Sequence, residues 1–160
     1  MPQERRAGDI GAGAASSADA QGAGEFLTAA QLLRHSLDVL LAKDIEAWAA
    51  LCDANVVVEF PFAPDAASRR TVGRRVIYDY MKEFTRPLDL HTVRAMRIHA
   101  TADPRIAIAE WSVAGQVIGN GNPYEMSHAT FATFENGLIV RYREYWNPCA
   151  LIAALDGTMF

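Results

Sequence analysis

The chain has 160 residues, a formal net charge of -4 and an apolar fraction of 51%. This length is typical of one domain with one hydrophobic core. The 15 basic residues are spread along the chain, so the concentrated positive surface that binds nucleic acid is not expected. No apolar run approaches the roughly 18 residues of a membrane-spanning helix. These features predict a cytoplasmic protein with neither a nucleic-acid nor a membrane partner.

Cysteine and histidine spacing gives no sign of a metal site. Cys52 and Cys149 are far apart, without nearby ligand spacing, and we expect two reduced, packed thiols. His91 and His99 face the same side of a predicted strand, but at about 3.3 Å per residue they are too far apart to share one ion. We therefore expect no metal and no cofactor.

The first 24 residues, MPQERRAGDIGAGAASSADAQGAG, contain almost no large apolar side chains. Ordering them would cost backbone entropy with little burial to offset it. We therefore expect a disordered tail over residues 1–24 and a single domain over residues 25–160.

Two helices are predicted at the start of the domain. From Glu25 to about residue 41, apolar residues such as Leu33 and Leu37 recur at the spacing of an amphipathic helix. Asp44 can cap a second helix, which we expect to end near residues 54–55. The inner stripe of this second helix comprises Ile45, Trp48, Ala49 and Cys52.

A strand and a third helix follow. The segment VVVEFPF, residues 56–62, is β-branched and aromatic and predicts the strand. After the loop APDAASRR, the third helix is expected from about Gly73 until Pro87 stops it. Its predicted inner residues are Val76, Ile77, Tyr80 and Phe84.

The second half of the chain is rich in strands separated by turn signals. The predicted strands are residues 91–100, 106–118, 124–135 and 138–147. Asn136-Gly137 suits a tight hairpin, which favours an antiparallel meander. Asn147 and Pro148 are typical of the start of a short final helix. The fold class is therefore α+β, with a curved, mainly antiparallel sheet around the N-terminal helices.

The segment RYREYWNP, residues 141–148, contains the strongest candidate for chemistry. In a strand, Glu144 shares one face with Val140, Tyr142 and Trp146. Burial among these side chains would raise the pKa of Glu144 and suit it to proton transfer. The alternative is a structural glutamate paired with an arginine.

Two further side chains could assist Glu144. His128 shares its facing with Met126 and Thr130 on the neighbouring strand and could relay a proton, although a hydrogen-bonded core histidine is the commoner role. Tyr80, on the inner side of the third helix, could donate to a substrate oxygen or could be a core tyrosine.

Other candidates are weaker. Glu59 and Glu110 are more simply ion-pair partners of arginines on the last strand. The aromatic residues expected mainly in the core, with some lining any cavity, are Trp48, Phe60, Phe62, Trp111 and Trp146.

The segments KDIEAWAALCDANVVVEFPF and ENGLIVRYREYWNPCALIAAL resemble the SnoaL-like proteins of the ketosteroid-isomerase and nuclear-transport-factor superfamily, over residues 25–156. The C-terminal half resembles the phenazine-biosynthesis A/B proteins in particular. The resemblance implies a cone-shaped α+β barrel, a homodimer and an apolar pocket for a hydrophobic small molecule. Members of the superfamily include isomerases, cyclases, epoxide hydrolases and binding proteins, so the fold does not decide the reaction.

Several catalytic groups of these relatives are absent here. Phe60 stands where ketosteroid isomerases have their aspartate base, while Ser36 and Thr130 replace their oxyanion donors. Asn147 replaces the aspartate of SnoaL-type cyclases. The acid/base glutamate of the phenazine proteins corresponds to Glu144, and their ligand-contacting histidine corresponds to Tyr80.

These observations predict a cofactor-independent acid/base enzyme of secondary metabolism that isomerises, cyclises or condenses a hydrophobic cyclic or aromatic intermediate, or opens an epoxide. The alternatives are a binding protein without chemistry and a dimerisation module whose pocket is filled by side chains. The expected catalytic residues are Glu144, His128 and Tyr80. The expected substrate-binding residues are Trp146, Tyr142, Phe60, Trp48, Ser36 and Trp111.

Overall fold

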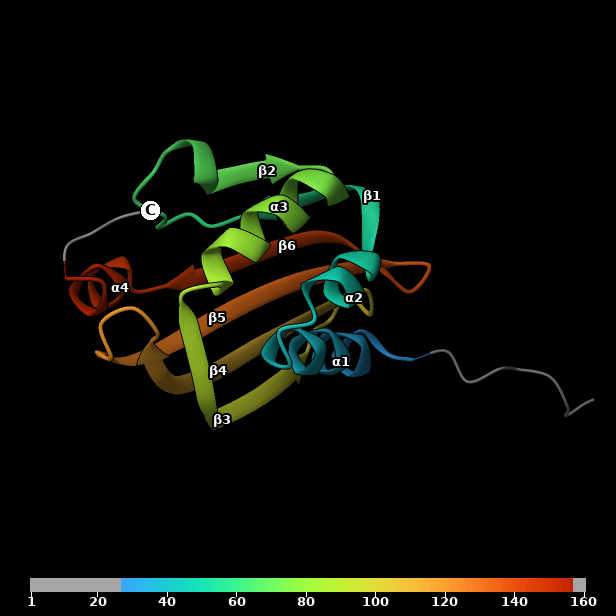
Figure 1. Cartoon of the computed structure of the whole chain (residues 1–160). Coiled ribbons are helices and arrows are strands. Elements are labelled where there is room, and N and C mark those ends of the chain that lie inside the picture. The colour runs from blue at the N-terminus through green and yellow to red at the C-terminus, as the bar shows by residue number, and fades with distance from the viewer. Residues whose placement is uncertain (1–26, 157–160) are drawn as a thin grey trace, which may run out of the picture.

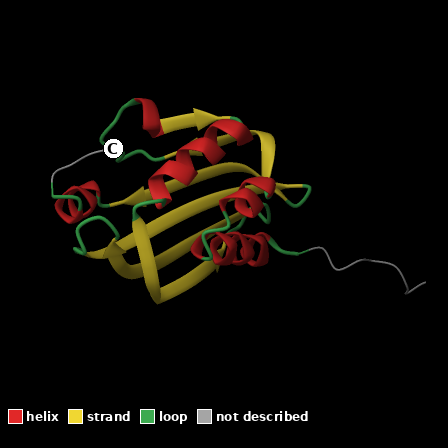
Figure 2. Cartoon of the chain, in the orientation of Figure 1, coloured by secondary structure: helices red, strands yellow, loops and turns green. Residues whose placement is uncertain are grey.

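The computed structural model describes residues 27–156, so the predicted tail over residues 1–24 lies outside the described part. The helices and the strands form two layers, with α1, α2 and α3 on one face of a curved sheet (Figures 1 and 2). The helices are α1 (Ala29–Leu41), α2 (Ile45–Ala50), α3 (Arg74–Thr85) and α4 (Pro148–Ala154), with a short 3-10 turn at Ala67–Arg69. The strands are β1 (Cys52–Glu59), β2 (Arg70–Val72), β3 (Leu88–Ala100), β4 (Ile106–Val117), β5 (Pro123–Glu135) and β6 (Leu138–Trp146).

Side-chain caps fix where the helices begin. Thr28 forms a reciprocal capping box with Gln31 at the start of α1. The predicted caps of α2 and α4 are confirmed. The Asp44 side chain accepts from the backbone N–H of Ala47, and the Asn147 side chain accepts from that of Cys149.

The strand order is β2-β1-β6-β5-β4-β3. Strands β3 to β6 form the predicted antiparallel meander, and the predicted hairpin turn at Asn136 and Gly137 has positive φ at both residues. Strand β1 joins the sheet parallel to β6, and the short β2 pairs antiparallel with β1. The sheet is therefore mixed, and the predicted α+β class with a curved sheet around helices is confirmed.

Several local predictions are wrong, of which four concern the ends or the facing of elements and the burial of a thiol. α2 ends at Ala50, so the buried Cys52 begins β1 instead of continuing the helix. Val76 is 51% exposed, because Ile77 and Met81 form the buried row of α3. Cys149 is an exposed thiol and not a packed one.

The fourth concerns the facing of β6. The register of β5 and β6 shifts between Thr133 and Phe134. This irregularity reverses the alternation at its position, so that Ile139 is buried and Val140 is only half-buried. Beyond it, Tyr142, Glu144 and Trp146 point inward as predicted.

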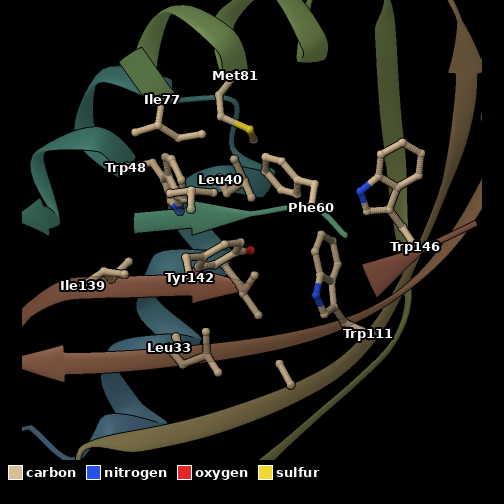
Figure 3. Packing of buried hydrophobic residues seen from close by; sticks show 14 of the residues in the cluster. Leu33, Leu40, Trp48, Phe60, Ile77, Met81, Trp111, Ile139, Tyr142 and Trp146 are labelled. Atoms are coloured by element: carbon tan, nitrogen blue, oxygen red, sulfur yellow. The ribbon is translucent and has the colours of Figure 1, made fainter. Parts of the chain in front are cut away.

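The core lies between the helices and the concave face of the sheet. Figure 3 shows Leu33 of α1 and Tyr142 of β6 within this layer, with Trp111 and Trp146 rising from the sheet beside them. Trp48 packs edge-on against Tyr142, with ring centroids 5.6 Å apart. The apolar packing surrounds Glu144, a buried carboxylate, which is 7% exposed.

Candidate functional site

Glu144 lies at the centre of a buried polar cluster that β5 and β6 build together. Thr130 of β5 is its direct partner across the two strands, and His128 is the partner of Trp146. Because alternate residues of a strand face the same side, His128, Thr130, Tyr142 and Glu144 all point toward the helices. The pattern of alternation that predicted Glu144 and His128 therefore brings them together.

Both oxygens of the Glu144 carboxylate are hydrogen-bonded. Oε2 accepts from the Tyr142 hydroxyl at 2.6 Å and from the Thr130 hydroxyl at 2.9 Å. Oε1 lies 3.2 Å from Nδ1 of His128. The Thr130 hydroxyl in turn accepts from the indole N–H of Trp111 at 2.9 Å. The site is a connected network in which every donor is directed at the carboxylate or at its partner.

This network reverses the predicted shift in the pKa of Glu144. Burial raises the pKa, but the contact with His128 and the hydrogen bonds from His128, Tyr142 and Thr130 together outweigh it. The pKa of Glu144 therefore lies below its ordinary value, and the expectation of a raised pKa is wrong. Glu144 is an anion at neutral pH, which suits it to accept hydrogen bonds and not to deliver a proton.

The anion also fixes which nitrogen of the His128 ring faces it as a donor. An ionised carboxylate only accepts hydrogen bonds, so Nδ1 of His128 must carry the proton between them. Nε2 of a neutral ring is then a proton acceptor. The imidazole is stacked on Trp111, with centroids 4.0 Å apart and planes 9° apart, and this packing holds its orientation.

Glu144 and His128 both line a small enclosed chamber of about 50 Å³. Its other walls come from α1, α3 and the strands β3 to β5 and include Leu40, Met81, Phe84, Leu88, Trp111 and Tyr124. A water molecule occupies about 30 Å³ of the bulk liquid, so this chamber admits only a group of very few atoms.

A larger cleft of about 400 Å³ lies on the other side of Phe84, which lines both spaces. α3, the loop after β1 and α4 form this cleft, and Trp146 is part of its wall. Trp146 packs on Phe84 with ring centroids 5.9 Å apart. The cleft is within the range of about 300–1,000 Å³ that small-molecule sites occupy.

The remaining predicted site residues are spread over the fold. Tyr80 lines the cleft, where it is stacked between Phe60 and Phe84, and it does not belong to the Glu144 network. Trp48 and Phe60 are buried in the core, and neither lines the chamber or the cleft. Ser36 is buried and its hydroxyl donates to the Leu33 carbonyl within α1.

The other carboxylates singled out in the sequence form ion pairs on the outer face of the sheet. Glu59 accepts from Arg141 at 2.9 Å and from Arg143 at 2.8 Å, and Glu110 pairs with His99 at 3.0 Å. Within residues 27–156, no group of three or more side chains is arranged to hold a metal ion. The described helices are too short or too polar to cross a membrane.

The sequence did not identify the parts played by Thr130 and Phe84, nor Ser68 as a residue of the cleft wall. The sequence did indicate the facing of Thr130, because it lies two residues from His128 on the same strand and so shares its face. Phe84 was predicted to face inward, but its position between two spaces depends on α3 and α4 meeting. Ser68 lies in a loop, where alternation carries no information.

The arrangement defines an α+β protein whose helices cover a curved sheet and enclose a buried carboxylate–imidazole pair. The model of the SnoaL-like domain matches residues 33–142, and the chain belongs to this family. The predicted family is thus confirmed.

Two curated relatives and one solved structure cover most of the chain. The "Uncharacterized protein YesE" of Bacillus subtilis (strain 168) is 38% identical over 134 residues, which are 84% of this chain and 91% of the relative. The "Uncharacterized PhzA/B-like protein PA3332" of Pseudomonas aeruginosa is 33% identical over 133 residues, which are 82% of this chain and 92% of the relative. A structure described as a "Putative Isomerase from Bacillus subtilis" has 37% identity and a TM-score of 0.76, covering 82% of this chain and 94% of that chain.

Proposed function

We propose that the protein is a cofactor-independent acid/base enzyme of secondary metabolism that isomerises, cyclises or condenses a hydrophobic cyclic or aromatic intermediate. The observation that carries the proposal is the 3.2 Å contact between His128 and the anionic Glu144 at the wall of the chamber. The likeness to the structure described as a "Putative Isomerase" supports the same class of reaction.

The two residues have different roles. His128 is the catalytic base, because its Nε2 is a proton acceptor on a ring that lines the chamber. It removes a proton from a carbon beside a substrate carbonyl, and the electron pair of the broken C–H bond moves into the enolate. Glu144 is the positioning residue, which holds the tautomer and stabilises the imidazolium that forms. His128 then returns the proton to a different carbon of the substrate or to the oxygen.

Hydrogen–deuterium exchange tests this proposal without knowledge of the natural substrate. We expect the protein in deuterium oxide to accelerate loss of the methyl protons of 2-acetonaphthone, a flat ketone, at least about 100-fold over a His128→Asn variant. Proton NMR follows the exchange. The control is His99→Asn, which removes an exposed histidine from the outer face of the sheet and should leave the rate unchanged. Equal rates for the protein and for His128→Asn would exclude the base role.

A binding protein without chemistry is the second candidate, and the chamber volume of about 50 Å³ favours it, because no whole ring fits in the chamber that Glu144 and His128 line together. A binder would retain the ketone without exchanging its protons. The third candidate, a dimerisation module with a filled interior, is disfavoured by the cleft of about 400 Å³.

The homodimer predicted from the family resemblance remains a proposal, and the outer face of the sheet supports it. Phe62 is 56% exposed on this face and Phe131 is 39% exposed. The prediction that Phe62 lies mainly in the core is therefore wrong. Both rings pack on the ring of Tyr145, with centroid distances of 5.4 Å for Phe62 and 5.9 Å for Phe131. Arg97 and Glu110 lie opposite each other on the same face, so a second copy related by a two-fold axis can pair with both charges.

We expect the protein to sediment as a dimer and Phe131→Lys to shift it to the monomer, because the substitution would bury a charge in the proposed interface. Val76→Lys, on the exposed side of α3, is the control and should remain dimeric. Sedimentation of the unsubstituted protein as a monomer would contradict the proposal.

A further inference from the structure

The cleft has an aromatic wall that suits a flat ligand. Tyr80 and Phe84 are stacked, with centroids 5.9 Å apart and planes 13° apart, and Trp146 closes the inner end against Phe84. His128 is the neighbour of Trp146 across β5 and β6. Phe84 lines both the cleft and the chamber, so an arm that enters the chamber from the cleft must pass its side chain.

The two spaces differ in what they can hold. The cleft of about 400 Å³ takes a ring system, whereas the chamber of about 50 Å³ takes only a short substituent. A molecule that spans both must be a flat body with a small arm, and the arm must carry the carbonyl that His128 acts on.

The polar edge of the cleft offers hydrogen-bond acceptors. The Ser68 hydroxyl donates to Asp65 at 2.9 Å, and this bond is the first cause of the lowered pKa that keeps Asp65 ionised. Ser68 also interacts with the Tyr80 hydroxyl. The Tyr80 hydroxyl lies at this edge of the cleft, near the Asp65 carboxylate.

The charges around the cleft agree with this polarity. The described residues that line it include Asp65, Asp79 and Glu83 but no lysine or arginine. Asp79 and Glu83 are exposed and paired with Arg75 and Arg86, which leaves Asp65 as the main acceptor for a ligand. An anionic ligand would meet the Asp65 carboxylate at this edge of the cleft.

We propose that this cleft is a recognition site for an uncharged, flat aromatic ring that bears a hydrogen-bond donor, such as a phenol, at one end and a short carbonyl arm at the other. The proposal rests on the proposed function for the role of the carbonyl arm. The phenol donates to Asp65 or Tyr80, the ring stacks on Phe84 and Trp146, and the arm passes into the chamber.

A pair of matched probes tests the donor requirement. We expect 6-hydroxy-2-acetonaphthone to bind about tenfold more tightly than 6-methoxy-2-acetonaphthone, because only the former can donate to a charged acceptor. Probe fluorescence measures both affinities. In Asp65→Asn the charged acceptor becomes an amide that can also donate to the methoxy oxygen, so the preference should fall below about threefold.

A second pair of variants tests the place of binding. Leu155→Trp puts an indole on the wall of the cleft and should weaken both probes at least tenfold. Val76→Trp adds the same ring to the exposed side of α3 and should change neither.

The outcomes separate this inference from the proposed function. Binding with the hydroxyl preference but without deuterium exchange would retain the recognition site and reject the enzyme. Exchange that depends on His128, together with equal affinities for the two probes or no effect of Leu155→Trp, would retain the enzyme and overturn the recognition site.

Discussion

Glu144→Gln is expected to lower the rate of deuterium exchange by about 100-fold or more while the protein stays folded. The amide oxygen can still accept from Tyr142 and Thr130, and the amide NH2 group then faces Nδ1 of His128. To accept from this NH2 group, Nδ1 must lose its proton, and Nε2 becomes N–H. The ring then has no acceptor directed at the chamber, and the base is lost.

Nitrogen-15 NMR of the His128 ring checks this directly. The unsubstituted protein should show protonated Nδ1 and bare Nε2, and Glu144→Gln should show the reverse. A purely structural role for Glu144 would change the stability but would not reverse the tautomer. Glu59→Gln is the matched control, because Glu59 also accepts several hydrogen bonds but on the outer face of the sheet.

The same variant has a pH signature in the stability. Since the pKa of Glu144 is lowered in the folded protein from its ordinary value of 4.5, folding favours the ionised form. This contribution to the free energy of unfolding is complete above pH 4.5 and is lost as the pH falls through the lower folded pKa. The unsubstituted protein should therefore lose more stability than Glu144→Gln between neutral pH and acid.

Alternation along two strands was enough to place Glu144 and His128 on the same face of the sheet. In β5 and β6 the period of two is a local property, so the sequence could assign Glu144 and His128 to one buried face. The prediction that Val140 faces the core with Glu144 was wrong, because Val140 lies at the register shift. An extra residue in one strand reverses the facing of the side chains, and the local sequence pattern does not show it.

The sign of the pKa shift could not be predicted in the same way. Burial of Glu144 was visible in the sequence and argued for a raised pKa. The opposing effect needs three donors aimed at one carboxylate, and their aim depends on the pairing of Thr130 with Glu144 and on side-chain conformations. The cleft depends likewise on where α3, α4 and the Ser68 loop meet, which is a property of the tertiary structure.

Gly115→Ala is expected to destabilise the protein by about 3 kcal/mol or more, because added atoms would overlap backbone that cannot move aside. A Cβ at this position would lie 2.0 Å from the Asp89 carbonyl oxygen and 2.8 Å from Cα of Leu90. Chemical denaturation measures the loss. Gly119→Ala is the matched control, since nothing lies within 4 Å of its added Cβ, and it should change the stability by less than about 1 kcal/mol.

This close approach has a consequence for the site. Gly115 pairs with Leu90, and the register of β3 and β4 shifts directly afterwards, between Leu90 and Thr92, where β3 turns a corner (Figure 1). Leu88 and Leu90, just before the corner, line the chamber that holds Glu144 and His128. Gly115→Ala should therefore force β3 away from β4, open this wall and lower the exchange rate even under conditions where the variant is fully folded. Stability and exchange rate equal to those of Gly119→Ala would show that β3 can shift without cost and that the corner does not shape the chamber.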